Sequence, residues 1–241
     1  MLPPQIDVKV VLMWIGAANS STIPAAWDRW LRHHWRRVNE LQIIGLPGGM
    51  KQDQFTTYRY QLLLAREYCA RSTADDRRTV IYFLEDDYFH LPTALAELIQ
   101  FLQFKPDAVA TLYDHPDGYT RSDNRLQARF GVTVGVNANE LSRHWKPIES
   151  TTGTWAATKL SFQTHAFPAW DPAQCRVENC PEDRPNSRLI WDLGGSIWAP
   201  IPSLSSHSEA AFMAPLINWK AWLAHMEMVE RTSPVQLLVV E

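Results

Sequence analysis

The chain has 241 residues, of which 46% are hydrophobic and 20% are charged. This balance is typical of a packed globular protein and argues against a disordered or membrane-embedded chain. The formal net charge of -3 lacks the basic surface that binding to nucleic acid requires, so we expect no nucleic-acid partner. A length below roughly 250 residues fits one α/β core, and we expect residues 1–241 to form a single domain.

The cysteines and the first residues of the chain indicate in which cellular compartment we expect the protein. Cys69, Cys175 and Cys180 are too few for the disulfide framework of a small secreted protein. Cys175 and Cys180 lack partners at metal-binding spacing, which leaves a local disulfide or two free thiols. The N-terminus has no basic region, and the apolar stretch 8–14 is too short to cross a bilayer. We therefore expect a cytoplasmic protein without an integral membrane segment.

The first part of the chain alternates short apolar runs with helical patterns. β-Branched and apolar residues predict strands over 8–14 and 41–46, and each run ends at a glycine-containing loop. Apolar residues at helical spacing predict amphipathic helices over 25–38 and 54–71. The first of these helices carries a run of Arg and His residues, which we interpret as a solvated helix face rather than a phosphate site.

The clearest pattern follows, where the continuous apolar run 79–84 predicts a central strand that is covered on both faces. Pro92 begins a predicted helix over 92–104, and a further strand is predicted over 108–113. The alternation of strands and helices predicts an α/β fold with a mostly parallel sheet. Ligands of such sheets bind outside the carboxyl ends of the strands.

The pattern is weaker in the second half of the chain. A strand is predicted within 151–161, and 168–188 is interpreted as a Pro-rich loop. Two short apolar pieces follow at 189–193 and 196–201.

Three acids, Glu85, Asp86 and Asp87, directly follow the central apolar run. If the strand geometry continues, Glu85 and Asp87 share one side, because side chains alternate between the faces of a strand. Mg²⁺ and Mn²⁺ prefer such oxygen ligands and keep open positions for substrate phosphates. The alternative is a solvated turn or a helix cap that is stabilised by the dipole of the following helix.

These features resemble bacterial glycosyltransferase-like proteins of the GT-A fold, which carry an acidic motif at a strand end. The resemblance implies a three-layer αβα sandwich with a mostly parallel central sheet. It also implies a nucleotide-sugar-binding half over 1–115 and an acceptor-binding half over 116–241. The segments that carry the resemblance are 80–88, 111–117, 150–154 and 200–209.

The resemblance implies roles for individual residues. Asp87 and His207 would bind a Mn²⁺ or Mg²⁺ ion together with the diphosphate of the donor. Glu85 or Asp86 would contact the ribose or the sugar, and the stretch from Trp14 to Asn19 loosely resembles the loop that binds the donor base. The chain has Glu-Asp-Asp where the family motif often begins with Asp, so the metal dependence is inferred. The alternative for His207 is a hydrogen-bonded structural residue.

Transfer to a hydroxyl group requires a general base near the acceptor. By resemblance Asp192 is the candidate base and Asp114 is the reserve, and the alternative for Asp192 is a helix cap before a glycine turn. Three tryptophans, Trp155, Trp191 and Trp198, either stack on an acceptor sugar or pack in the core.

The function that we expect is a hexosyltransferase-type reaction, which moves a sugar from a nucleotide-sugar donor to a glycan or another hydroxyl acceptor. Two alternatives remain: a metal-dependent phosphohydrolase or nuclease that uses the same acids, and a sugar-nucleotide-binding module without catalysis.

Overall fold

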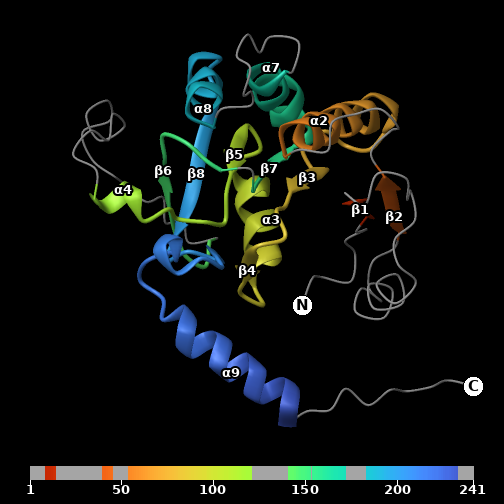
Figure 1. Ribbon diagram of the computed structural model, residues 1–241. Coiled ribbons are helices and arrows are strands. Elements are labelled where there is room, and N and C mark those ends of the chain that lie inside the picture. The colour runs from red at the N-terminus through yellow and green to blue at the C-terminus, as the bar shows by residue number, and fades with distance from the viewer. Residues whose placement is uncertain are drawn as a thin grey trace, which may run out of the picture.

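The structure is a computed structural model that describes residues 9–14, 40–45, 54–120, 141–152, 154–171 and 183–232 (Figure 1). Side chains are described for residues 56–119, 141–152, 154–171 and 183–228. The strands are β1 (Lys9–Trp14), β2 (Glu40–Gly45), β3 (Val80–Phe83), β4 (Tyr88–His90), β5 (Ala108–Ala110), β6 (His144–Pro147), β7 (Trp155–Thr158), β8 (Ser196–Ile201) and β9 (Ser205–His207). The helices are α2 (Gln54–Arg71), α3 (Ala94–Phe104), α4 (Asp117–Thr120), α6 (Lys159–Ser161), the π-helix η1 (Phe162–Ala166), α7 (Phe167–Trp170), α8 (Asp183–Asp192), the 3₁₀-helix η2 (Ala210–Phe212) and α9 (Trp219–Thr232).

The largest sheet has five strands in the order β3-β7-β5-β8-β6. Only β5 and β8 pair in parallel, whereas β3–β7, β5–β7 and β6–β8 are antiparallel. The chain is thus α/β, but the expectation of a mostly parallel sheet is wrong for this sheet. The apolar run of β7 lies between β3 and β5 and runs opposite to both. A continuous apolar run is buried equally well in either direction, so its sequence does not reveal its orientation.

Apolar side chains fill both faces of this sheet. Successive residues of a strand point to opposite faces, and β5 shows this directly. Val109 packs in a cluster with Phe162 of η1 and Ile190 of α8. Ala108 and Ala110 pack in a second cluster with residues of α3 such as Phe101. Helices therefore cover both faces, with α3 on one and α2, α7 and α8 on the other (Figure 1).

Two smaller sheets accompany the main one. β1 and β2 pair in parallel, and β4 pairs with β9 in antiparallel register, with Tyr88 opposite His207. An isolated bridge between Tyr113 and Ser205 places β9 beside the segment that follows β5. Since β3, β5 and β8 share one direction, their carboxyl ends lie at the same edge of the main sheet, where β4 and β9 also lie.

Most predicted elements are present with small changes in their ends. The predicted helix 54–71 is α2, and the predicted strand 196–201 is β8. Residues 189–192 of the apolar piece 189–193 are instead the end of helix α8, which begins inside the stretch 168–188 that is interpreted as a loop. The predicted helix 25–38 and the cysteines at 175 and 180 lie outside the described residues. Among the described helices, none is both long and apolar enough to cross a membrane.

Candidate functional site

The three acids lie in the loop between β3 and β4. β3 ends at Phe83, so the alternation expected for a continuing strand does not apply, and all three acids are exposed. Thr154, which is fully buried, holds Glu85 in place. Its hydroxyl oxygen lies 3.1 Å from the Glu85 backbone nitrogen, which donates to it, and 3.2 Å from the Glu85 carboxylate. The loop is thereby tied to the start of β7.

Asp87 and His207 meet across the β4–β9 pair. The Oδ2 atom of Asp87 lies 3.1 Å from the Nε2 atom of His207. The Nδ1 atom of His207 accepts a hydrogen bond of 3.0 Å from the backbone N–H of Glu209. Because Nδ1 accepts, the neutral ring carries its proton on Nε2, the atom that faces the Asp87 carboxylate. The structure thus brings together the two residues that the sequence predicted as metal ligands.

Asp87 and His207 provide the spacing and the donor types that a small divalent ion requires. Two donors that are adjacent around an octahedral ion at about 2.1 Å are about 3 Å apart, which matches the observed separation. An ion bound to His207 would replace the Nε2 proton, and the ring would then carry its proton on Nδ1 and lose the hydrogen bond from Glu209. Within the described part of the chain, no group of three or more His, Cys, Asp or Glu side chains is arranged to hold a metal. Any ion would therefore need further ligands from substrate or water.

Negative charge accumulates around this pair. Loss of solvent around its carboxyl group and the charge of Asp87 raise the pKa of Glu85, and a hydrogen bond from Thr154 partly opposes this effect. Loss of solvent and the charge of Glu85 raise the pKa of Asp183 to about 6. Carboxyl groups whose pKa values are raised in this way occur often at sites that bind cations or transfer protons.

Asp183 is the site residue that the sequence analysis missed. It is the first residue of α8, whereas the sequence pattern predicts a Pro-rich loop over 168–188. The available signal was its position as an acid ahead of Pro185 and an apolar stretch, which is typical of the first turn of a helix. Its charge interaction with Glu85 is a tertiary effect that the sequence does not contain.

The remaining predicted donor-site and catalytic residues have different outcomes. Asp192 is exposed at the other end of α8, about 14 Å along the helix axis from Asp183 at the usual rise per residue. Asp86 is exposed in the acidic loop, and its charge contributes to the raised pKa of Glu85. The backbone of Trp14 ends β1, and Asn19 lies outside the described residues.

Asp114 is buried in an ion pair. Its side chain is 2% exposed, and its Oδ1 atom lies 2.6 Å from the Nζ atom of Lys146, which is 7% exposed. Its second carboxylate oxygen accepts a hydrogen bond from the hydroxyl of Tyr119, whose ring lies 4.1 Å from the Lys146 Nζ atom. Both oxygens are thus engaged, so Asp114 is placed to anchor α4 rather than to take a proton from a substrate.

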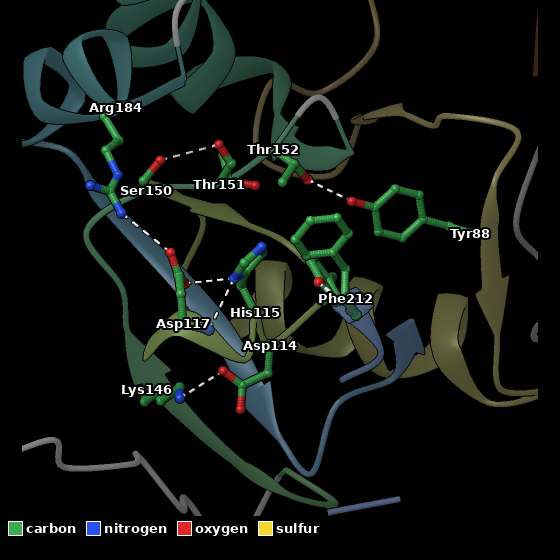
Figure 2. A network of polar contacts seen from close by, with 11 residues as sticks. Tyr88, Asp114, His115, Asp117, Lys146, Ser150, Thr151, Thr152, Arg184 and Phe212 are labelled. Carbon is green, nitrogen blue, oxygen red and sulfur yellow. Dashed lines mark hydrogen bonds and ion pairs between the residues drawn. The ribbon is translucent and has the colours of Figure 1, made fainter. Parts of the chain in front are cut away.

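A second chain of polar contacts lies next to this ion pair (Figure 2). It consists of His115, Asp117 and Arg184 and is called the His115 chain below. The Nδ1 atom of His115 lies 2.6 Å from Oδ1 of Asp117, and Oδ2 of Asp117 lies 3.2 Å from Nη2 of Arg184. Arg184 directly follows Asp183 in α8. The contact between Asp117 and Arg184 therefore ties α4 to the first turn of α8.

Aromatic rings connect the two polar groups. Their contacts form a closed circuit in which the ring centroids of successive members are 5.2 to 6.0 Å apart. The five members are Tyr88, Tyr113, His115, Phe212 and His207. Tyr88 also pairs through its hydroxyl with the hydroxyl of Thr152 at 3.0 Å. The candidate ion site and the His115 chain thus lie on opposite sides of one aromatic cluster.

The three tryptophans that we considered as sugar platforms are occupied within the fold. Trp155 is completely buried, and its Nε1 atom donates to the Tyr58 hydroxyl at 2.6 Å. Trp191 packs on one core cluster and Trp198 on the other. The core-packing alternative therefore fits all three.

Comparisons with known proteins identify no family or relative for this chain. A scan against protein-family models finds none that matches the chain, and a search of curated proteins finds no match.

Proposed function

We propose that this protein is a divalent-cation-dependent glycosyltransferase, which moves a sugar from a nucleotide donor to a hydroxyl acceptor. The observation that carries the proposal is the convergence of Asp87 and His207 at 3.1 Å beside Glu85 and Asp183. We further propose that helices on both faces of the mixed sheet form a three-layer arrangement of the GT-A type. The position of the acids at the carboxyl edge of the sheet supports the proposal, because ligands of α/β sheets bind at this edge.

Asp87 and His207 would hold a Mn²⁺ or Mg²⁺ ion. Such an ion supplies positive charge that stabilises the leaving diphosphate during transfer. Asp87 belongs to the half of the chain that we assign to the donor (1–115), and His207 belongs to the acceptor half (116–241). The ion site would thus lie between the parts of the chain that bind the two substrates. Glu85, oriented by Thr154, would accept hydrogen bonds from hydroxyl groups of the donor.

Asp183 is the group that we propose as the general base. A base works best when its pKa is close to the working pH, and the pKa of Asp183 is raised to about 6. Asp183 lies close enough to Glu85 to sense its charge, and this proximity supports a base beside the donor. Asp192, predicted as the base from the sequence, lies at the opposite end of the same helix.

A turnover assay tests this function. The full chain is incubated with a panel of UDP- and GDP-sugars and Mn²⁺, and released nucleoside diphosphate is measured with and without a panel of sugar acceptors. We expect Mn²⁺-dependent release that acceptors accelerate. Release of inorganic phosphate from nucleotides or simple phosphate esters, unaffected by acceptors, would favour the hydrolase alternative. Binding of a donor without turnover across the acceptor panel would favour the binding module.

A further inference from the structure

The His115 chain has no part in holding the proposed ion. Its contacts nevertheless fix the orientation of the His115 imidazole ring. Asp117 holds the Nδ1 side of the His115 ring at 2.6 Å, and Arg184 holds Asp117 at 3.2 Å. The ring itself contacts Tyr113, with centroids 5.3 Å apart, and Phe212, with centroids 6.0 Å apart. The orientation of the imidazole is therefore set by contacts on its edge and its faces.

The opposite edge of this ring presents the Nε2 atom. Nδ1 is 2.6 Å from a carboxylate oxygen and 3.1 Å from the backbone nitrogen of Asp117. Because Nδ1 accepts the hydrogen bond from the Asp117 backbone N–H, the neutral ring carries its proton on Nε2. Among the described residues, no hydrogen-bond partner lies at Nε2, and the side chain is 34% exposed. An ordered N–H donor is thus available to a ligand.

The Phe212 ring lies against the His115 ring, and Phe212 is 41% exposed. Its backbone carbonyl accepts a hydrogen bond of 2.5 Å from the Tyr113 hydroxyl, so its position is fixed by a side chain of the core. The Phe212 ring contacts His115 on one side and His207 on the other, where the centroids are 5.8 Å apart. An apolar ring surface is thus exposed beside a polar edge.

We propose that His115 and Phe212 form a binding subsite for a carbohydrate acceptor. This inference rests on the proposed transferase function and assigns the acceptor to the sugars, rather than to protein side chains or lipids. A sugar ring has an apolar C–H face that packs on an aromatic ring, and its hydroxyl oxygens accept hydrogen bonds from a fixed donor such as the Nε2–H group. Asp117 and Arg184 are positioning residues that act through His115.

The subsite is adjacent to both parts of the proposed reaction centre. Phe212 contacts His207, which would hold the ion and hence the diphosphate of the donor. Arg184, at the other end of the polar chain, follows the proposed base Asp183 in sequence. A sugar bound at His115 and Phe212 is therefore close to the donor and to the base.

The test is a binding experiment with the full chain on an array of defined oligosaccharides, in the presence of Mn²⁺ and UDP or GDP. Nucleotide binding is measured on the same samples by calorimetry. Phe212→Ala and His115→Ala are compared with the matched controls Phe104→Ala and His144→Ala, whose side chains are exposed elsewhere on the protein. Circular dichroism and thermal unfolding show that each variant is folded.

We expect the parent to bind a carbohydrate class and both subsite variants to bind it about tenfold or more weakly, as the loss of one hydrogen bond or stacking contact implies. Nucleotide binding and the two controls should stay within about twofold of the parent. His115→Gln, whose amide reaches the position of Nε2, should recover part of the affinity, whereas His115→Asn, which reaches only Nδ1, should not.

The experiment distinguishes failure of the subsite proposal from failure of the transferase proposal. If Mn²⁺ and nucleotide bind but the parent binds no carbohydrate, or Phe212→Ala and His115→Ala bind it as well as the parent, the subsite is wrong and the transferase proposal stands. If no nucleotide binds with Mn²⁺, the transferase proposal itself is wrong. Carbohydrate binding that is lost in the subsite variants would then identify a sugar-binding site without a donor.

Discussion

Asp87 and His207, which are 120 residues apart in sequence, lie with a carboxylate oxygen 3.1 Å from an imidazole nitrogen. The register of β4 and β9 produces this contact, because Tyr88 is directly opposite His207 and Asp87 immediately precedes β4. A backbone hydrogen bond from Ser208 to the Asp87 carbonyl, 2.8 Å long, continues the pairing. The candidate ion site is therefore built on paired backbone, which gives its two side chains a defined separation.

Binding of an ion should change the tautomer of His207. In the free protein Nδ1 accepts from the Glu209 backbone, so the neutral ring carries its proton on Nε2. An ion at Nε2 forces the proton to Nδ1. Nitrogen-15 NMR of labelled histidine should show this exchange when Mg²⁺ and a nucleoside diphosphate are added. An unchanged Nε2–H tautomer in the saturated complex would exclude His207 as a ligand.

Removing the charge of Asp87 should lower the pKa of Glu85, because the Asp87 charge is one of the causes that raise it. Carbon-13 NMR of the side-chain carboxyl groups can follow this titration in Asp87→Asn. Asp107→Asn is a matched control, since Asp107 is an exposed carboxylate at the end of α3. An identical Glu85 titration in Asp87→Asn and the parent would mean that the two carboxylates do not interact in solution.

Asp183 should set the lower pH limit of the reaction. Its pKa in the folded protein is about 6, so the proton must leave before Asp183 can act as a base, and kcat/KM should fall as pH decreases through about 6. Asp183→Asn should reduce kcat by about 10²- to 10⁴-fold, and Asp192→Asn is the matched control on the same helix. A large loss in Asp192→Asn with full activity in Asp183→Asn would restore the assignment made from the sequence.

The raised pKa of Asp183 also affects the free energy of unfolding. Below about pH 4 the carboxyl group is protonated in both the folded and the unfolded chain and contributes nothing. Between about 4 and 6 the folded chain retains a proton that the unfolded chain has lost, so this group lowers the free energy of unfolding as pH rises. Asp183→Asn should therefore gain stability relative to the parent over this window. The gain is modest because the residue is exposed and solvent screens its charge.

Asp114 should prove structural. Asp114→Ala leaves Lys146 buried without its partner, and we expect a loss of about 3 to 5 kcal/mol in the free energy of unfolding, measured with urea. Asp107→Ala breaks the solvent-exposed pair with Lys105 and should cost less than about 1 kcal/mol. If Asp114→Asn instead kept the stability of the parent but abolished transfer, Asp114 would be a catalytic residue.

Much of the secondary structure follows from local patterns. The helical spacing of apolar residues gave α2 with the observed ends, and the apolar runs before the acids gave β3 and β5. β4 and β9 were not predicted because their sequences, Tyr-Phe-His and Ser-Ser-His, lack the apolar run that indicates β3 and β5. They form only through their mutual pairing, which is a tertiary effect.

The candidate site could also be predicted only in part, because some of its residues are brought together only by the tertiary fold. Glu85 and Asp87 stand out because acids directly follow a buried strand, and the family resemblance added His207. Asp183 carries no such signal, because the charge of Glu85 acts on it through space. His115 was passed over because its environment depends on Asp117 and Phe212, and Phe212 is 97 residues further along the chain.

The most direct test of the central claim is calorimetric titration of UDP and GDP into the full chain with and without Mn²⁺. The parent, Asp87→Asn, His207→Gln and the control Asp107→Asn are compared. We predict Mn²⁺-dependent binding to the parent and the control, weakened about tenfold or more in both site variants, with each variant folded as judged by circular dichroism. Nucleotide binding that does not require Mn²⁺, or that is equally tight in Asp87→Asn and the parent, would contradict a cation and diphosphate site at Asp87 and His207.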